Sequence, residues 1–197
     1  MTACISTPCN QEIEKYLNLW NTTDKFVLQE NSINKLFTKI FPNNTDTENV
    51  LIKASVLNDF YSTNIFSIFD MAKHIVSLDI DERLKNGDDS LVSEIGHIEI
   101  ADKKKYFYSF ATKYCSHHNP DAFPVYDSYV DKVLMHFKKV DKFAKFKRDD
   151  LKDYPTYKKI LKKFAEFYGI TSYSLKELDM YLWQLGKDKF SSNNEGE

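Results

Sequence analysis

The sequence predicts an all-α protein in the form of a two-lobed helical bundle. Apolar residues recur every three or four positions along nearly the whole chain of 197 residues, which is the period of an α-helix. Only 5 Gly and 5 Pro interrupt this pattern, and alternating strand patterns are scarce. Ile98-Glu99-Ile100 is the only short strand candidate, and we expect it to be too small to build a sheet.

The size and composition suit one domain of the larger kind or two small lobes. Hydrophobic residues make up 42% of the chain and aromatic residues 15%, which is enough for a packed core. We expect a single helical domain over residues 1–190. Its possible lobes are 46–137, and 1–45 together with 138–190, and residues 191–197 are expected to form a disordered polar tail.

The first half of the chain is expected to hold helices in the following order. They are Gln11–Trp20, Ser32–Phe41, a long helix running on from Val50 after the capping residues Thr45-Asp46-Thr47-Glu48, a helix over Ile65–Ile75, and a short helix that starts near Asp88. The acidic stretch Asp79–Asp89 does not have the spacing of a calcium-binding EF-hand loop. A helix end and a turn are therefore predicted there.

The segment Ala111–Val130 is punctuated by two prolines. Because Pro120 biases the residue before it away from the α region, the helix that carries Lys113 should stop near His118. After the second proline, apolar residues return at helical spacing from Val130 onward. Asp127 is a natural N-cap for this next helix, and capping alone would account for its presence.

The C-terminal part predicts two more helices. They are Lys158–Tyr168, stopped by Gly169, and Ser174–Leu185, ended by Gly186, with each glycine at the position that follows a helix.

The three cysteines, Cys4, Cys9 and Cys115, provide neither a paired framework nor a four-thiolate set, which favours a reduced, intracellular protein. No run of 18 apolar residues and no signal-peptide pattern is present in the sequence. We therefore expect a cytoplasmic protein, of the bacterial cytosol or nucleoid, with no membrane association and no obligate protein partner. Glycine-rich phosphate loops, serine nucleophile elbows and zincin motifs are also absent from the sequence.

We expect no metal and no cofactor. Cys115, His117, His118 and His136 are the residues that raise the question of zinc. Adjacent histidines on a helix point about 100° apart, and the spacing fits no structural zinc motif.

The segment Pro120-Asp121-Ala122-Phe123-Pro124-Val125-x-Asp127-x-x-Val130 resembles the loop and following helix of the helix-hairpin-helix/GPD DNA glycosylases. The resemblance implies that Asp127 is the catalytic carboxylate, and that Lys113 is the amine of the bifunctional members, which also cut the backbone. The chain departs from the family pattern in two features. Ser109-Phe110-Ala111 stands where the family has its glycine-rich hairpin, and the separation between Lys113 and Asp127 is several residues shorter than in the family.

The resemblance also implies a pocket for an extruded base. Near the end of the helix that follows Val50, Asn58 and Tyr61 occupy the place where the family has polar residues facing the DNA. Tyr126, His117 and His118 could line the same pocket, because aromatic and imidazole rings stack on flipped bases. Each of these residues also has a plain structural explanation, as a core residue or a helix terminator.

A basic strip follows the helix of Asp127. Residues 138–163 hold eleven basic and four acidic side chains, a local net charge of +7 in a chain whose net charge is −2. The residues expected to contact the DNA backbone are Lys138, Lys139, Lys142, Lys145, Lys147 and Arg148. The solvated face of an amphipathic helix would show the same pattern.

The sequence thus predicts a DNA glycosylase that extrudes and excises a damaged or modified base, with a possible lyase activity at abasic sites. Asp127 would stabilise the developing positive charge on the sugar, and a desolvated Lys113 would attack C1′. Two alternatives stay open: a non-catalytic helical DNA-binding protein, and a helical protein-interaction domain in which Asp127 is only a cap.

Overall fold

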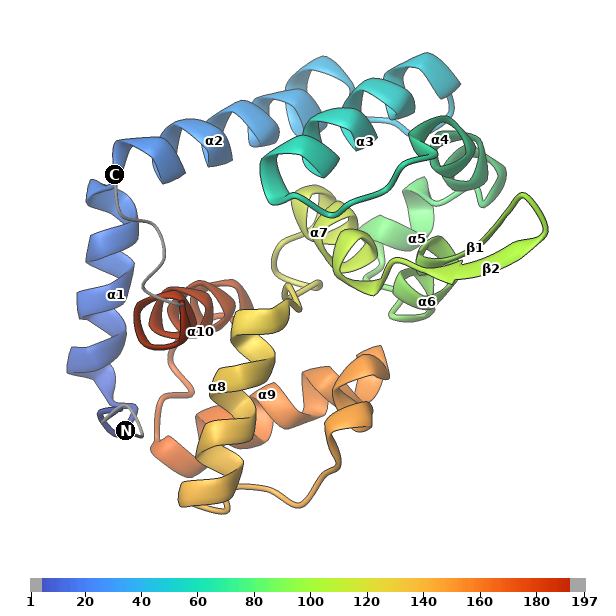
Figure 1. Ribbon diagram of the computed structural model, residues 1–197. Helices are drawn as coiled ribbons and strands as arrows, with labels where there is room; N and C mark the ends of the chain where they lie inside the picture. The colour runs from blue at the N-terminus through green and yellow to red at the C-terminus, as the bar shows by residue number, and fades with distance from the viewer. Residues whose placement is uncertain (1–4, 192–197) are drawn as a thin grey trace. The chain divides into compact units, whose positions relative to one another are not determined.

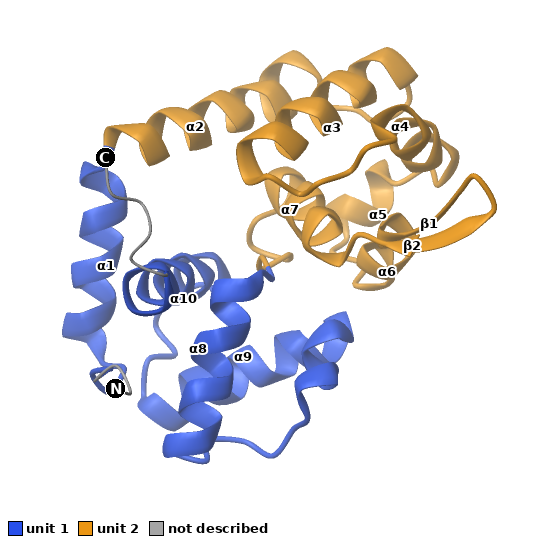
Figure 2. Cartoon of the chain, viewed as in Figure 1, with its two compact units in different colours: residues 1–23, 126–197 blue, residues 24–125 orange. Residues whose placement is uncertain are grey.

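The computed structural model describes residues 5–191, which divide into two compact units. Unit 1 is made of Met1–Thr23 and Tyr126–Glu197, and unit 2 is the continuous segment Asp24–Val125 (Figure 2). The expected tail, from residue 192 onward, and Cys4 lie outside the described residues. The chain is mostly helical, so the all-α class is confirmed (Figure 1).

Unit 1 is built from four α-helices and one 3-10 turn within the described residues. They are α1 (Asn10–Thr22), α8 (Ser128–Val140), the 3-10 turn η2 (Arg148–Lys152), α9 (Tyr154–Tyr168) and α10 (Leu175–Phe190). Helix α10 packs against α1, α8 and α9, which makes it the centre of this unit. Aromatic side chains connect α1 with α10. The rings of Trp20 and Trp183 are in edge-to-face contact, with 5.4 Å between their centroids.

Unit 2 is built around α7, which contacts α3, α5, α6 and η1. Its elements are α2 (Asp24–Lys35), the π-helical turn η1 (Leu36–Ile40), α3 (Thr47–Tyr61), α4 (Ile68–Ser77), α5 (Asp81–Lys85), α6 (Ser90–Gly96), β1 (His97–Ile100), β2 (Lys103–Tyr106) and α7 (Tyr108–His118). Nine of the 11 residues of α7 are buried. A helix that is buried on all sides is the core of its unit.

Helix termini follow the expected chemistry. Asp46 accepts a hydrogen bond from the backbone N–H of Asn49 at the start of α3, and Ser174 and Glu177 form a capping box at the start of α10. Helix α7 ends at His118, as the following proline predicts. Gly169 has the left-handed conformation expected of a residue that closes a helix, with φ of 66° after α9.

Three expectations about elements are wrong. The N-terminal helix of unit 2 begins at Asp24 rather than at Ser32. Residues 98–100 do pair: β1 and β2 form an antiparallel hairpin, whose turn residues Ala101 and Asp102 both have positive φ, as a two-residue hairpin turn requires. Gly186 does not end a helix, because α10 runs on to Phe190.

Gly186 has a packing role in the α8–α10 contact. A Cβ atom at this position would lie 2.7 Å from the Cβ of Tyr129 and 2.8 Å from its carbonyl oxygen. Only glycine therefore lets α10 approach α8 this closely.

The boundaries of the two units also differ from the lobes expected at 46–137 and at 1–45 with 138–190. Helix α2 and turn η1 belong with α3 and α7, because Phe37 of η1 packs its ring against Tyr114 of α7 at 5.2 Å. Helix α8 belongs with α10. Lys113 is consequently in unit 2 and Asp127 in unit 1.

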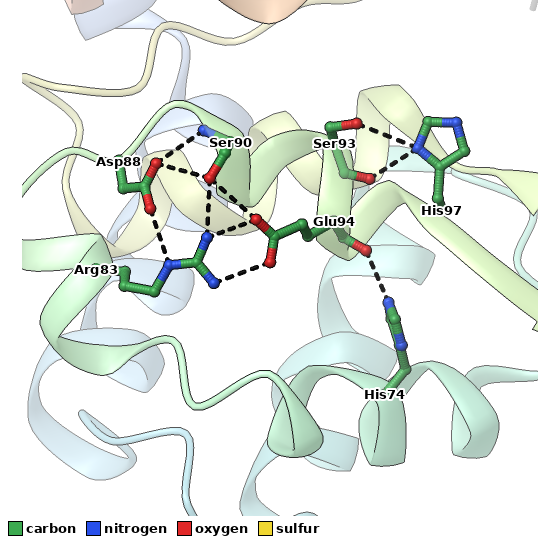
Figure 3. A network of polar contacts seen from close by, with 7 residues as sticks. All are labelled: His74, Arg83, Asp88, Ser90, Ser93, Glu94 and His97. Atoms are coloured by element: carbon green, nitrogen blue, oxygen red, sulfur yellow. Dashed lines mark hydrogen bonds and ion pairs between the residues drawn. The ribbon is translucent and has the colours of Figure 1, made fainter.

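A polar network fastens α5 to α6 within unit 2 (Figure 3). The Arg83 guanidinium donates from both terminal nitrogens to Glu94, at 2.9 and 2.6 Å, and from Nε to Asp88 at 2.8 Å. These bonds lower the pKa of Glu94, and Ser90 and Arg83 together lower the pKa of Asp88. The acidic stretch Asp79–Asp89 forms the short helix α5 and a turn. Its Asp88 binds Arg83 of the same stretch.

Candidate active site

Lys113 lies on the central helix of unit 2 with only 5% of its surface exposed. Its Nζ donates a hydrogen bond of 2.5 Å to Oγ of Ser109, one helical turn earlier. The same Nζ lies 5.4 Å from the centre of the Tyr61 ring, within the range of a cation–π contact. Ser109, one helical turn before Lys113, therefore holds its amine.

A second polar contact joins Tyr61 to His117. The Tyr61 hydroxyl lies 3.0 Å from Nε2 of His117, and Nδ1 of the same ring lies 3.3 Å from Oδ1 of Asn34. Because the Asn34 oxygen can only accept, Nδ1 carries a proton, and in a neutral ring Nε2 accepts from the tyrosine. Of the residues predicted from the sequence, Lys113, Tyr61 and His117 are thus brought together.

A buried lysine that the sequence reasoning missed lies on α3. Lys53 is fully buried, and its Nζ donates to the carbonyl oxygen of Asn43 at 3.0 Å and to Oδ1 of Asn44 at 2.7 Å. Burial lowers the pKa of Lys53 to about 8, partly opposed by the charge of Asp81. Asn44 in turn donates from Nδ2 to Asp81 at 2.6 Å and accepts from the Tyr114 hydroxyl at 2.6 Å.

His118 belongs to the Lys53 cluster and not to the group around Lys113. Its Nε2 lies 3.3 Å from Nζ of Lys53, and an ammonium can only donate, so the imidazole is the acceptor and is neutral. Burial, with a smaller contribution from the Lys53 charge, lowers the pKa of His118 to about 3. The ring also packs against Phe37 at 5.0 Å. These contacts are those of a core histidine.

Asn58 holds a loop. Its Oδ1 accepts from the Thr63 hydroxyl at 2.7 Å and from the backbone N–H of Ile65 at 2.9 Å, and its Nδ2 donates to the Ile65 carbonyl at 3.3 Å. The loop that it fixes contains two non-glycine residues with positive φ, Ser62 and Asn64. Asn58 thus stabilises a strained connection between α3 and α4.

Asp127 is the N-cap of α8 in unit 1. Its Oδ1 accepts hydrogen bonds from the backbone N–H groups of Tyr129, at 2.9 Å, and Val130, at 3.0 Å. Both hydrogen bonds use the same carboxylate oxygen, Oδ1, and the cap does not use Oδ2. Capping, the plainer of the two explanations, therefore describes what Asp127 does within its own unit.

Tyr126 is also in unit 1 and supports the ion pair between the buried Asp131 and the exposed Arg148. Its hydroxyl donates to Oδ2 of Asp131 at 3.1 Å, and Nε of Arg148 donates to Oδ1 of the same carboxylate at 2.8 Å. Burial raises the pKa of Tyr126, and the charge of Asp131 raises it further. Arg148, predicted to contact DNA, therefore already binds a carboxylate, although 60% of its side chain is exposed.

A basic hollow of about 590 Å³ lies on the surface of unit 1. It is lined by Lys132, Met135, His136, Lys138, Lys139, Arg148 and Phe190. Four of these residues follow each other at helical spacing on one face of α8, so the hollow is a property of that helix face. It contains three of the six residues predicted to bind the DNA backbone.

The other three predicted backbone contacts, Lys142, Lys145 and Lys147, are exposed in the connection between α8 and η2. Lys142 has a φ of 54°, which marks a tight turn there. The phenylalanines between these lysines, Phe143 and Phe146, are buried. Buried phenylalanines and exposed lysines therefore alternate along this segment, and it is not a helix.

A signal in the sequence could have revealed Lys53. The buried residues of α3 are Val50, Lys53, Ala54 and Leu57, which follow the i, i+3, i+4, i+7 pattern of a core-facing stripe. A lysine within such a stripe is rarely buried without a partner. The partners Asn43, Asn44 and Asp81 come from separate segments, so their meeting could not be read from spacing.

The fold and this site define a helical protein whose central buried helix carries an amine and two histidines. Residues 12–122 match the model of the family HI_0787_N, described as an N-terminal domain, and the chain belongs to this family. A protein of Haemophilus influenzae, named as an uncharacterized protein, is 57% identical over 147 residues, which is 74% of this chain and 70% of that protein. No solved structure matches the chain.

The matched region contains Lys53, Lys113, His117 and His118 but stops before Asp127. The buried amine clusters of unit 2 therefore lie inside the family's domain. Among the described residues, no helix is both long enough and apolar enough to cross a membrane.

Proposed function

We propose that this protein binds DNA and excises a damaged or modified base, with the amine of Lys113 as the attacking group. The observation that carries the proposal is the setting of Lys113: a lysine on a buried central helix, held by Ser109 and placed against the Tyr61 ring. Lysines are among the side chains least often buried. A buried amine held by polar groups is a common feature of lysine nucleophiles.

The chemistry that we propose begins with an extruded nucleotide. The neutral amine of Lys113 attacks C1′ of the deoxyribose, the C1′–N bond to the amine forms, and the base leaves with the electrons of the glycosidic bond and takes up a proton. Loss of a further proton and opening of the sugar ring give a Schiff base, which permits elimination of the 3′ phosphate. The His117–Tyr61 pair lies beside the amine and is the nearest candidate to exchange these protons.

For Asp127 we retain the role that the resemblance implies, stabilisation of the positive charge that develops on the sugar. Its support is the resemblance alone, because within unit 1 the contacts of Asp127 are those of the α8 cap. For DNA binding, the support comes from the basic hollow of unit 1 and the exposed lysines that follow it. A protein with this function would act in the cytosol or on the nucleoid of a bacterium.

The test is borohydride trapping on a duplex that carries a single abasic site, which requires no knowledge of the excised base. We expect wild type to form a covalent adduct and Lys113→Gln to lose it. Lys53→Gln is the matched buried-lysine control, and Asp127→Asn should retain the helix cap but slow the reaction. An absence of trapping in wild type, or equal trapping in Lys113→Gln, would remove Lys113 from this role.

A second candidate is a non-catalytic DNA-binding protein. It is favoured by the capping role of Asp127 and by the small exposure of Lys113, 5%. In that case DNA affinity would fall when Lys138 and Lys139 are neutralised, while no variant would change any base or sugar chemistry.

A further inference from the structure

The β1–β2 hairpin of unit 2 carries a run of lysines that no function described so far uses. All four residues of β2, Lys103, Lys104, Lys105 and Tyr106, are exposed. We propose that this hairpin is a second DNA-contacting element, which binds the phosphate backbone of duplex DNA through Lys103 and Lys105. The proposal rests on the proposed function in that it takes DNA as the partner.

The pairing register of β1 and β2 determines which charged side chains lie on the same face of the hairpin. Glu99 stands directly opposite Lys104, and His97 opposite Tyr106. Since directly paired residues point to the same side of a sheet and successive residues alternate, one face carries both of these pairs. The acidic side chain of Glu99 therefore offsets Lys104.

The other face carries positive charge without an acidic strand residue. Lys103 is paired with Ile100 and Lys105 with Ile98, so the four strand residues on this face are two lysines and two isoleucines. Ile98 is buried and Ile100 partly buried, whereas both lysines, on β2, are exposed. Lys103 and Lys105 are two residues apart along one strand, about 7 Å. The exposed strand β2 thus presents two neighbouring charges of one sign, which is complementary to a row of phosphates.

Two further features suit the hairpin to this partner. His97 and Tyr106 stack at 3.8 Å with their planes 13° apart, which braces the base of a ribbon that would otherwise be marginally stable. The tight turn of Ala101 and Asp102 keeps the ribbon narrow.

The experiment measures binding of a short labelled DNA duplex by fluorescence anisotropy across a series of salt concentrations. We expect Lys103→Gln combined with Lys105→Gln to weaken affinity about tenfold or more at low salt, and to reduce the slope of log affinity against log salt by about 2. Lys104→Gln should have a smaller effect than either change alone. A double variant of two exposed lysines near the end of the first helix of unit 2, Lys35→Gln with Lys39→Gln, controls for net charge.

The possible outcomes separate the two proposals. If wild type shows no salt-dependent affinity for DNA, the proposed function fails and this inference fails with it. If wild type binds and the hairpin variant binds equally well, or loses no more affinity than the Lys35/Lys39 control, only this inference is overturned. Self-association of the hairpin variant with unchanged DNA affinity would mean that the lysines merely guard an exposed strand edge.

Discussion

Units 1 and 2 differ in the lysines at their candidate sites. Unit 2 buries Lys53 and Lys113 on two neighbouring helices, and each amine donates to oxygen atoms and lies near an aromatic ring. Unit 1 displays its lysines around the hollow on α8 and buries a carboxylate, Asp131, instead. A buried amine must be held by fixed partners, whereas an exposed amine is available to a polyanion, so the contrast separates a site suited to chemistry from a surface suited to binding.

The largest effect that we expect comes from removing the buried charge in unit 2. Lys53→Met keeps the length of the side chain but removes the donor to the Asn43 carbonyl and one of the two donors to the Asn44 oxygen, which keeps its bond from Tyr114. The free energy of unfolding should fall by about 3 kcal/mol. Urea denaturation measures this, with Lys139→Met in unit 1 as the exposed counterpart.

Lys139→Met should change the free energy of unfolding by less than about 0.5 kcal/mol, because the side chain is exposed. It should instead weaken DNA binding. If Lys53→Met and Lys139→Met changed the free energy of unfolding equally, the proposed difference between the two units would be wrong.

In unit 1 the contact between α8 and α10 depends on a glycine. Gly186→Ala places a methyl group 2.7 Å from the Cβ of Tyr129, so α8 and α10 must move apart. We expect a loss of about 2 kcal/mol in thermal or urea unfolding. Gly169→Ala serves as a control, since a Cβ atom there meets nothing within 4 Å and only the strain of its positive φ is tested. A neutral result for Gly186→Ala would show that this contact does not set the spacing of α8 and α10.

The pH dependence of stability sharpens the contrast further. Burial lowers the pKa of Lys53 to about 8 in the folded state, below the ordinary value of 10.5. Between these two values the unfolded chain binds more protons than the folded one, so stability should rise as pH increases from about 8 to 10. The wild-type protein should gain roughly 1–2 kcal/mol over Lys53→Met across this window in parallel denaturation curves.

His118 does not complicate this window, because its pKa of about 3 keeps it neutral throughout. A difference between wild type and Lys53→Met that stays constant from pH 8 to 10 would contradict the assigned burial of the amine.

The smallest effect concerns the cap of α8. Asp127→Ala removes the acceptor of two backbone N–H bonds and should cost about 1 kcal/mol, whereas Asp127→Asn keeps an acceptor and should cost less. If Asp127 is only a cap, borohydride trapping should fall only as far as stability does, and Asp127→Asn should change it very little. A large loss of trapping in Asp127→Asn with normal stability would assign it a role in the reaction.

Much of the fold could be predicted from local signals. Apolar spacing predicted the helices, Pro120 predicted the end of α7, and Gly169 predicted the end of α9, because these depend on residues within a few positions of each other. Gly186 was misread because the same residue type also serves close packing, which depends on Tyr129, far away in the sequence. The hairpin was missed because its second strand consists of three lysines and a tyrosine and has no apolar alternation.

The candidate site was only partly predictable for the same reason. Tyr61, His117 and Lys113 were singled out and do lie together, but the roles of Asn58 and His118 depend on the loop at Ile65 and on Lys53. No spacing rule links such distant segments. Which amine is buried, and what holds it, emerged only from the folded unit.

The measurement that tests the central claim most directly is peptide mapping of the borohydride-reduced adduct by mass spectrometry. The account predicts that wild type carries the reduced sugar on Lys113, in the peptide from α7. An adduct on an exposed lysine of the hollow, such as Lys132 or Lys139, or the absence of any adduct, would contradict it.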